Sequence, residues 1–166
     1  QAIAPAQVLR GVVHWPEAIE AIARLGQRPL LLGRSNATAS IRQELAETFG
    51  CHGLRPLPAN LNHDCCEVDL TRIASLGETA TCDLVIAIGG GKVLDAGKLL
   101  ADRLDLPCVT VPTSAATCAG WTALANLYSP GGAFCHDVAL RRCPELLVFD
   151  HALVKQAPSQ IGRAHG

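Results

Sequence analysis

The chain has 166 residues, of which 49% are hydrophobic and only 17% charged, and its formal net charge is −1 at pH 7. This length and composition supply the core of one domain, or of one lobe of a larger protein. The balanced charge argues against a nucleic-acid or anionic membrane partner. There is no apolar run of about 18 residues and no signal peptide pattern, which predicts a cytoplasmic protein without a membrane span. The chain contains no methionine, so we expect it to lack its native start.

Cysteine and histidine spacing does not predict a metal site in this chain. No two cysteines form a C-x-x-C pair, and Cys65 and Cys66 are adjacent, unlike the ligand pairs of structural zinc sites. The six histidines show no metal-binding spacing. We expect reduced, mostly structural thiols rather than a disulfide framework at the eight cysteines: Cys51, Cys65, Cys66, Cys82, Cys108, Cys118, Cys135 and Cys143.

The first half of the chain predicts alternating strands and helices. Short apolar runs bounded by glycine or proline indicate strands, and apolar residues at helical spacing indicate helices. Asp64 is the expected N-cap of the third helix and Gly77 its end. The predicted elements are an edge strand at 7–13, a helix from Pro16 to Leu25, a strand at 29–33, a helix at 38–49, a short strand near 54–57 and a helix at 64–76.

The second half first continues this alternation, and its amino-acid composition then changes. Residues 115–125 are small and polar, and a turn follows Tyr128. The predicted elements are strands at 84–88, 107–112 and 146–149, and helices at 92–104 and 152–157. Such alternation predicts an α/β fold with a Rossmann-like, mostly parallel sheet and helices on both faces. We assign residues 1–158 to this domain and 159–166 to an irregular tail.

The strongest local signal is Gly89-Gly90-Gly91-Lys92, which joins a buried strand to a helix. Glycines allow a sharp turn and the close approach of an anion, while the helix N-terminus and Lys92 favour negative charge. The pattern is neither the G-x-G-x-x-G fingerprint nor the P-loop. We interpret it as a phosphate site, the alternative being a glycine-rich turn without a ligand.

Several polar residues follow other predicted strand ends. Thr113, Ser114 and Thr117 are placed to bond phosphate, ribose or carboxamide, or else serve as ordinary turn residues. Arg34 follows the strand at 29–33 and lies either beside a ribose or in solvent. Asp95 is either a ligand-positioning residue or one half of a surface pair with Lys98.

Longer motifs give these residues a family context. Gly89-Gly-Gly-Lys-Val-Leu-Asp-Ala-Gly-Lys98 and Val111-Pro-Thr-Ser-Ala-Ala-Thr117 resemble the glycerol dehydrogenase branch of the iron-containing alcohol dehydrogenase family, of dehydroquinate-synthase-like fold. The resemblance extends from about Leu30 to Pro158 and includes Pro144-Glu-Leu-Leu-Val-Phe-Asp150. It implies an N-terminal lobe that holds NAD or NADP against a C-terminal helical domain, and hydride transfer from a small alcohol or polyol with zinc or iron as the metal. The cofactor-binding residues it implies are Gly89, Gly90, Gly91, Lys92, Val93, Leu94, Asp95, Thr113, Ser114, Ala116, Thr117, Thr122, Leu124 and Tyr128. Arg34 is a further cofactor-binding candidate because of its position after the strand at 29–33.

The chain departs from the family pattern at three points. The family's metal ligands, an aspartate and two histidines, belong to the helical domain, and Ile161–Gly166 does not resemble its entry; we therefore expect this chain alone to be inactive. Cys118 stands where the substrate loop of glycerol dehydrogenases has an aspartate, which makes it the candidate substrate contact and weakens glycerol as the substrate. Arg34 stands where NAD-dependent members carry an acidic residue, which favours the 2′-phosphate of NADP.

Alternative functions remain open from the sequence. Glycerol-1-phosphate dehydrogenase and dehydroquinate synthase share the same lobe, and a non-catalytic nucleotide-binding module needs the same phosphate site. A face normally covered by the helical domain would be exposed here, so we also expect aggregation or a homo-oligomer.

Overall fold

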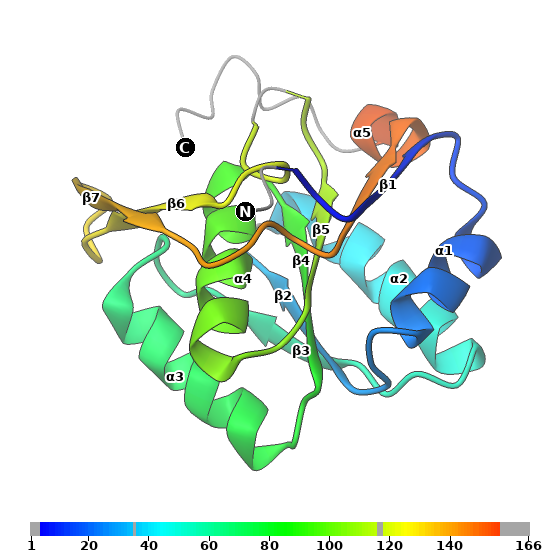
Figure 1. Ribbon diagram of the computed structural model, residues 1–166, viewed down its shortest axis with the longest axis horizontal. Helices are drawn as coiled ribbons and strands as arrows, with labels where there is room; N and C mark the ends of the chain where they lie inside the picture. Colours follow the sequence, from blue (N-terminus) through cyan, green and yellow to red (C-terminus); the bar gives the residue numbers. More distant parts are fainter. Residues whose placement is uncertain (1–3, 35, 116–117, 157–166) are drawn as a thin grey trace.

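The computed structural model describes residues 4–34, 36–115 and 118–156. Its centre is a six-stranded sheet in which every neighbouring pair of strands is parallel (Figure 1). The strand order is β1-β8-β5-β4-β2-β3. The strands are β1 (Gln7–Gly11), β2 (Pro29–Gly33), β3 (Leu57–Asn60), β4 (Leu84–Gly89), β5 (Cys108–Pro112) and β8 (Leu146–Asp150). The α/β architecture and the edge position of the first strand are as the sequence predicts.

Helices cover both faces of the sheet, as predicted. One face carries α1 (Trp15–Ala23), α2 (Ala39–Cys51) and α5 (His151–Gln156); the other carries α3 (Glu67–Thr79) and α4 (Gly91–Leu104). A short 3₁₀ turn, η1 (Asn36–Thr38), precedes α2. Two separate apolar clusters result, one on each face of the sheet. Strand β4 contributes to both because its successive side chains alternate between the faces.

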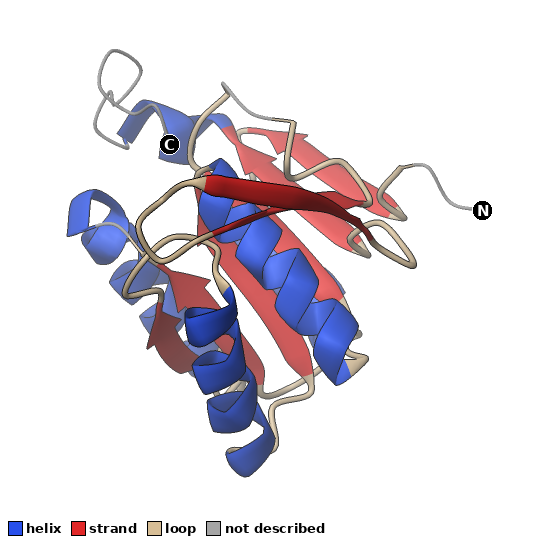
Figure 2. Cartoon of the chain, turned by 90° about the vertical axis from the view of Figure 1, so that its left-hand side faces the viewer, coloured by secondary structure: helices blue, strands red, loops and turns tan. Residues whose placement is uncertain are grey.

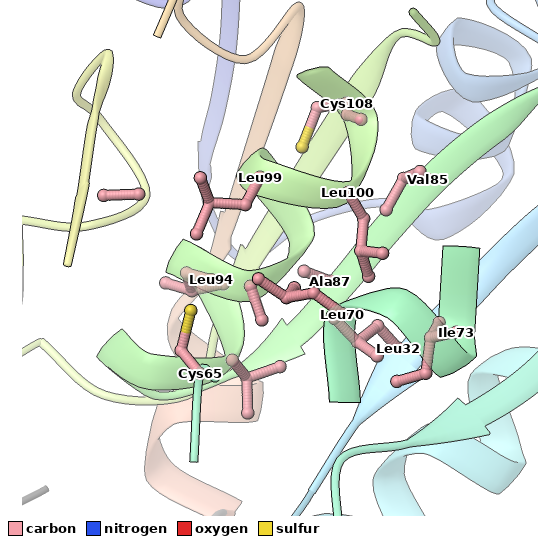
Figure 3. Close-up of a cluster of buried hydrophobic side chains, with 14 of the residues drawn as sticks. Leu32, Cys65, Leu70, Ile73, Val85, Ala87, Leu94, Leu99, Leu100 and Cys108 are labelled. Carbon is pink, nitrogen blue, oxygen red and sulfur yellow. The ribbon is translucent and has the colours of Figure 1, made fainter. Parts of the chain in front are cut away.

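Helix α4 packs closely on β4. Val85 and Ala87 of the strand face Leu94 and Leu100 of the helix, and all four are buried (Figure 3). Gly97 permits this approach, since a Cβ at that position would lie only 2.4 Å from the Cβ of Ala87.

The connections create a topological switch point between β2 and β4. These strands are neighbours, but the helix that follows β2 lies on one face of the sheet and the helix that follows β4 lies on the other. Ligands of open α/β sheets bind at such a switch point, outside the carboxyl ends of the strands. Arg34 and the glycine turn at 89–91 lie at these two strand ends.

The main element that the sequence analysis missed is an antiparallel hairpin, β6 (Leu124–Tyr128) and β7 (Phe134–Ala139). Only its turn was predicted. The hairpin lies across α4 on the side away from the sheet (Figure 2). Ala125 and Leu127 of β6 are buried in the same cluster as α4, whereas β7 is largely exposed.

Some element boundaries also differ from the prediction. Helix α3 begins at Glu67 with Cys66 as its N-cap, so Asp64 is not the cap. The helix continues through Gly77 to Thr79, because Gly77 serves close packing against Leu30 rather than a left-handed turn. Strand β3 starts at Leu57, later than expected. No helix in the described ranges is long and apolar enough to cross a membrane.

Candidate nucleotide-binding site

The glycine turn forms an open cradle at the N-terminus of α4. Gly89 has φ of +157°, and a Cβ there would lie 3.0 Å from Val93, so this position favours glycine. Gly90 is the N-cap residue of α4, and a Cβ there would meet no atom within 4 Å. The first N–H groups of a helix lack intrahelical partners, and its dipole is positive at this end. The turn therefore has the space and the donors that a phosphate group needs.

The second motif lies directly beside the first. The backbone N–H of Thr113 donates to the carbonyl oxygen of Gly89 over 3.0 Å, so the ends of β4 and β5 are joined. Thr113 is buried and Ser114 is half-buried next to it. Ala116 and Thr117 lie outside the described residues. The structure thus brings Thr113 and Ser114 to the glycine turn, as the motif spacing predicts.

An aspartate that the sequence analysis did not assign to the site connects its two cations. Asp64, in the loop after β3, lies with Oδ1 2.6 Å from Nη2 of Arg34 and with Oδ2 3.2 Å from Nζ of Lys92. Its side chain is only 10% exposed. Both carboxylate oxygens of Asp64 are therefore ion-paired, one with each cation.

The hairpin closes one side of this group. The Nζ of Lys92 lies 4.7 Å from the centroid of the Tyr128 ring, in a cation–π contact. The backbone N–H of Tyr128 donates to the carbonyl of Cys65, next to Asp64. Gly132, with φ of +91°, lies so close that a Cβ would be 2.7 Å from Oδ2 of Asp64. Tyr128 therefore lies beside Lys92, next to the glycine turn.

Asp95 and Lys98 form a buried pair, which corrects the surface-pair alternative. Their residues are 6% and 3% exposed, and Oδ1 of Asp95 lies 3.2 Å from Nζ of Lys98. Oδ2 of Asp95 accepts the backbone N–H of Asn126 over 3.0 Å. Lys98 donates to Thr122 and to the carbonyl of Leu124. Burial raises the pKa of Asp95 above its ordinary value, although the Asn126 N–H and Lys98 act in the opposite direction.

The remaining predicted residues lie around the cradle in different environments. The side chains of Val93 and Leu94 are buried in the core, so the groups they offer to a cofactor are backbone atoms. Leu124 is 45% exposed at the start of β6, and Cys118 is exposed in the loop that follows β5.

Within the described part of the chain, one group of side chains has metal-ligand proximity: His63, Cys66 and Asp69. Its carboxylate is already engaged, since Asp69 accepts the backbone N–H of His63 over 2.6 Å and lies 3.4 Å from Nη2 of Arg72. The group also lies at the positive end of α3, and Arg72 adds another positive charge, so its surroundings disfavour a cation.

Comparisons with known proteins agree with this geometry. The family profile described as iron-containing alcohol dehydrogenase matches residues 5–151. An uncharacterized oxidoreductase of Synechocystis sp. is 42% identical over 160 residues, covering 96% of this chain and 41% of that protein. A glycerol dehydrogenase of Escherichia coli O6:H1 is 30% identical over 142 residues, covering 86% of this chain and 39% of that protein.

A solved structure gives the same result in three dimensions. The crystal structure of a probable glycerol dehydrogenase from Sinorhizobium meliloti matches with a TM-score of 0.83 at 26% identity, covering 96% of this chain and 43% of the other. The chain thus spans about two fifths of the length of the curated relatives it matches. The chain belongs to the iron-containing alcohol dehydrogenase family.

Proposed function

We propose that this chain is the cofactor-binding lobe of an NAD(P)-dependent, metal-containing alcohol or polyol dehydrogenase. The observation that carries the proposal is the glycine turn at the β2/β4 switch point, with open space at Gly90 and a helix N-terminus behind it. Family membership supports an oxidoreductase, and the geometry supports a dinucleotide as the ligand of this lobe.

The proposed roles follow from the strand order. The pyrophosphate would bind to backbone N–H groups of residues 90–92, with Lys92 as a counter-charge. The adenosine ribose would lie toward the end of β2, near Arg34, and the nicotinamide toward β5, near Thr113 and Ser114. When bound, the cofactor supplies hydride acceptor chemistry, while the residues of this chain orient it.

The metal and the substrate also belong to the proposal. A zinc or iron ion would polarise the substrate oxygen, and we assign its ligands to residues outside this chain, which spans about two fifths of the relatives it matches. The substrate would be a small alcohol or polyol, with Cys118 in the loop after β5 as a contact.

Titration calorimetry of the purified chain with NAD and with NADP tests this function. We expect saturable binding of at least one of the two by a chain whose circular dichroism shows it to be folded. We also expect no alcohol oxidation by the 166-residue chain with added zinc. A folded chain that binds neither cofactor would contradict the proposal and favour a non-catalytic module. Turnover by the chain would contradict the placement of the metal ligands.

A further inference from the structure

The hairpin lies on α4 through a row of polar contacts. Residues in successive turns of α4 contact alternate positions of β6: Lys98 contacts Leu124, Asp95 contacts Asn126, and Lys92 contacts Tyr128. Strand β6 therefore crosses α4 in the direction of the helix N-terminus. The last contact of the row lies at the glycine turn, where Lys92 also pairs with Asp64.

Asp95 and Lys98 are the buried part of this row, and their polar atoms are fully engaged. Oδ1 of Asp95 pairs with Lys98 over 3.2 Å, and Oδ2 accepts the backbone N–H of Asn126 over 3.0 Å. Nζ of Lys98 donates to the carbonyl and hydroxyl oxygens of Thr122 over 3.2 Å and to the carbonyl of Leu124 over 2.5 Å. The pair therefore has no polar group left for a cofactor.

Apolar packing does not by itself fix the hairpin at one place on the helix. Ala125 and Leu127 are the residues of β6 that are buried, and β7 is largely exposed. Apolar contacts are non-directional, whereas hydrogen bonds depend on the alignment of donor and acceptor. A hairpin of two strands is also only marginally stable without support. The bonds from Asp95 and Lys98 are therefore suited to select one position of β6.

The position of β6 decides where the side chain of Tyr128 lies. The centroid of its ring is 4.7 Å from Nζ of Lys92 and 6.0 Å from the centroid of the Phe134 ring. The backbone N–H of Tyr128 donates to the carbonyl of Cys65 over 2.7 Å. One hydrogen bond allows a strand to turn about it, so a second point of attachment is needed to bring the ring to Lys92.

We propose that Asp95 and Lys98 are positioning residues, which fix β6 on α4 so that Tyr128 closes one side of the phosphate cradle. They act through the hairpin and touch no part of the cofactor. This role differs from the pyrophosphate contact that the family resemblance implies for Asp95. The inference rests on the proposed function, since it assigns the cradle to a dinucleotide.

The double substitution Asp95→Leu with Lys98→Met separates positioning from stability. Replacing a buried ion pair by apolar side chains of similar volume is often neutral for stability, because no unpaired charge remains. We therefore expect a folded chain with a midpoint of urea denaturation close to that of the wild type. The backbone N–H of Asn126 loses its acceptor, however, so we expect β6 to move.

Fluorine NMR of the chain labelled with fluorotyrosine measures this movement. The sequence contains one tyrosine, so the signal reports on Tyr128 alone. We expect the resonance of the double variant to move from the wild-type position toward that of the urea-denatured chain. By calorimetry we expect its affinity for NAD to fall at least about tenfold.

Asp150→Asn is the matched control for these measurements. Asp150, at the end of β8, is also a buried aspartate, 3% exposed, and it accepts the indole N–H of Trp15 over 2.8 Å. It makes no printed contact with the hairpin in the described part of the chain, so this variant should keep both the Tyr128 resonance and the NAD affinity of the wild type.

An unchanged resonance or an unchanged NAD affinity in the folded double variant would overturn the proposal. Hydrogen exchange on the wild type does not depend on folding of the variant. The amide of Asn126 should exchange as slowly as the buried amides of α4, and exchange as fast as in the exposed strand β7 would contradict the attachment. Absence of NAD binding by the wild type would instead contradict the proposed function, while the resonance and the exchange rate still test the position of β6.

Discussion

The backbone N–H of Thr113 donates to the carbonyl oxygen of Gly89 over 3.0 Å, which fixes the ends of β4 and β5 to each other. Two motifs that are separated by the whole of α4 in sequence therefore meet at one edge of the sheet. The third contribution to this edge is the Arg34–Asp64–Lys92 ion-pair group at the end of β2. We assign the cofactor to the switch point that these contacts surround.

Gly90→Ala should weaken cofactor binding without disturbing the fold. A Cβ at Gly90 meets no atom within 4 Å, but it would occupy the space through which a phosphate approaches the helix N-terminus. We expect at least about a tenfold loss of NAD affinity by calorimetry and little change in thermal unfolding. Gly50→Ala is the control, since that position in α2 is equally open and should leave NAD affinity unchanged.

Lys98→Met should strongly destabilise the protein. The substitution leaves the buried carboxylate of Asp95 without its ion pair and removes one of the donors to the carbonyl of Leu124. We therefore expect a loss of about 3 kcal/mol or more in the free energy of unfolding. Adding Asp95→Asn to this variant should restore part of the loss, because the unpaired charge is removed. Urea denaturation measures both. Additive losses in the double variant would show that the two residues are not coupled.

Stability should depend on the ionisation of Asp95 with a defined sign. Burial raises its pKa in the folded state above 3.8, its ordinary value, so between these two values the folded protein binds more protons than the unfolded chain. The contribution of Asp95 is therefore most favourable at low pH and falls as pH rises through this window. The difference in unfolding free energy between wild type and Asp95→Asn should decrease from pH 3.8 upward and then level off. A difference that increases with pH would contradict the assignment.

Gly97→Ala should destabilise the contact between α4 and β4. Alanine normally favours a helix, but its Cβ would lie 2.4 Å from that of Ala87, which is fully buried. We expect overpacking to cost about 1–3 kcal/mol in urea denaturation. Gly50→Ala provides the contrast, since its Cβ meets nothing within 4 Å in a helix. Stabilisation by both substitutions would mean that α4 does not approach the sheet this closely.

The cysteines should separate into reactive and unreactive groups. Burial is the largest cause that raises the pKa of Cys65 and Cys108 to about 12, so these thiols carry almost no thiolate at neutral pH. Cys51, Cys118 and Cys135 are exposed. Iodoacetamide labelling followed by mass spectrometry should modify the exposed group in the folded protein and the buried pair only after unfolding. Early modification of Cys65 would contradict the packing around α4.

Local patterns were sufficient to predict the sheet and the glycine turn between β4 and α4. The apolar run at 84–88 has one interpretation because it ends in three glycines and a helical pattern follows. The hairpin was missed because its strands bury few residues. Those few residues are buried only because they pack against the surface of α4. No short-range signal in the sequence describes that surface.

The charges at the site required the tertiary structure. An aspartate and a lysine three residues apart have the same spacing on an exposed or a covered helix face, and only the hairpin across α4 decides that Asp95 and Lys98 are buried. Asp64 lies two residues before the N-cap of its helix. It was predicted to be the cap itself because aspartate is a preferred N-cap residue. Its contacts instead come from Arg34, which follows β2, and from Lys92 in the first turn of α4. A polar residue past the end of β3 was the signal that could have indicated them.

The most direct test of the central claim is a crystal structure of the chain with NAD. We predict that the pyrophosphate oxygens lie within hydrogen-bond distance of the backbone N–H groups of residues 90–92, at the N-terminus of α4. Cofactor density at any other part of the chain, with the glycine turn free of phosphate, would contradict the account.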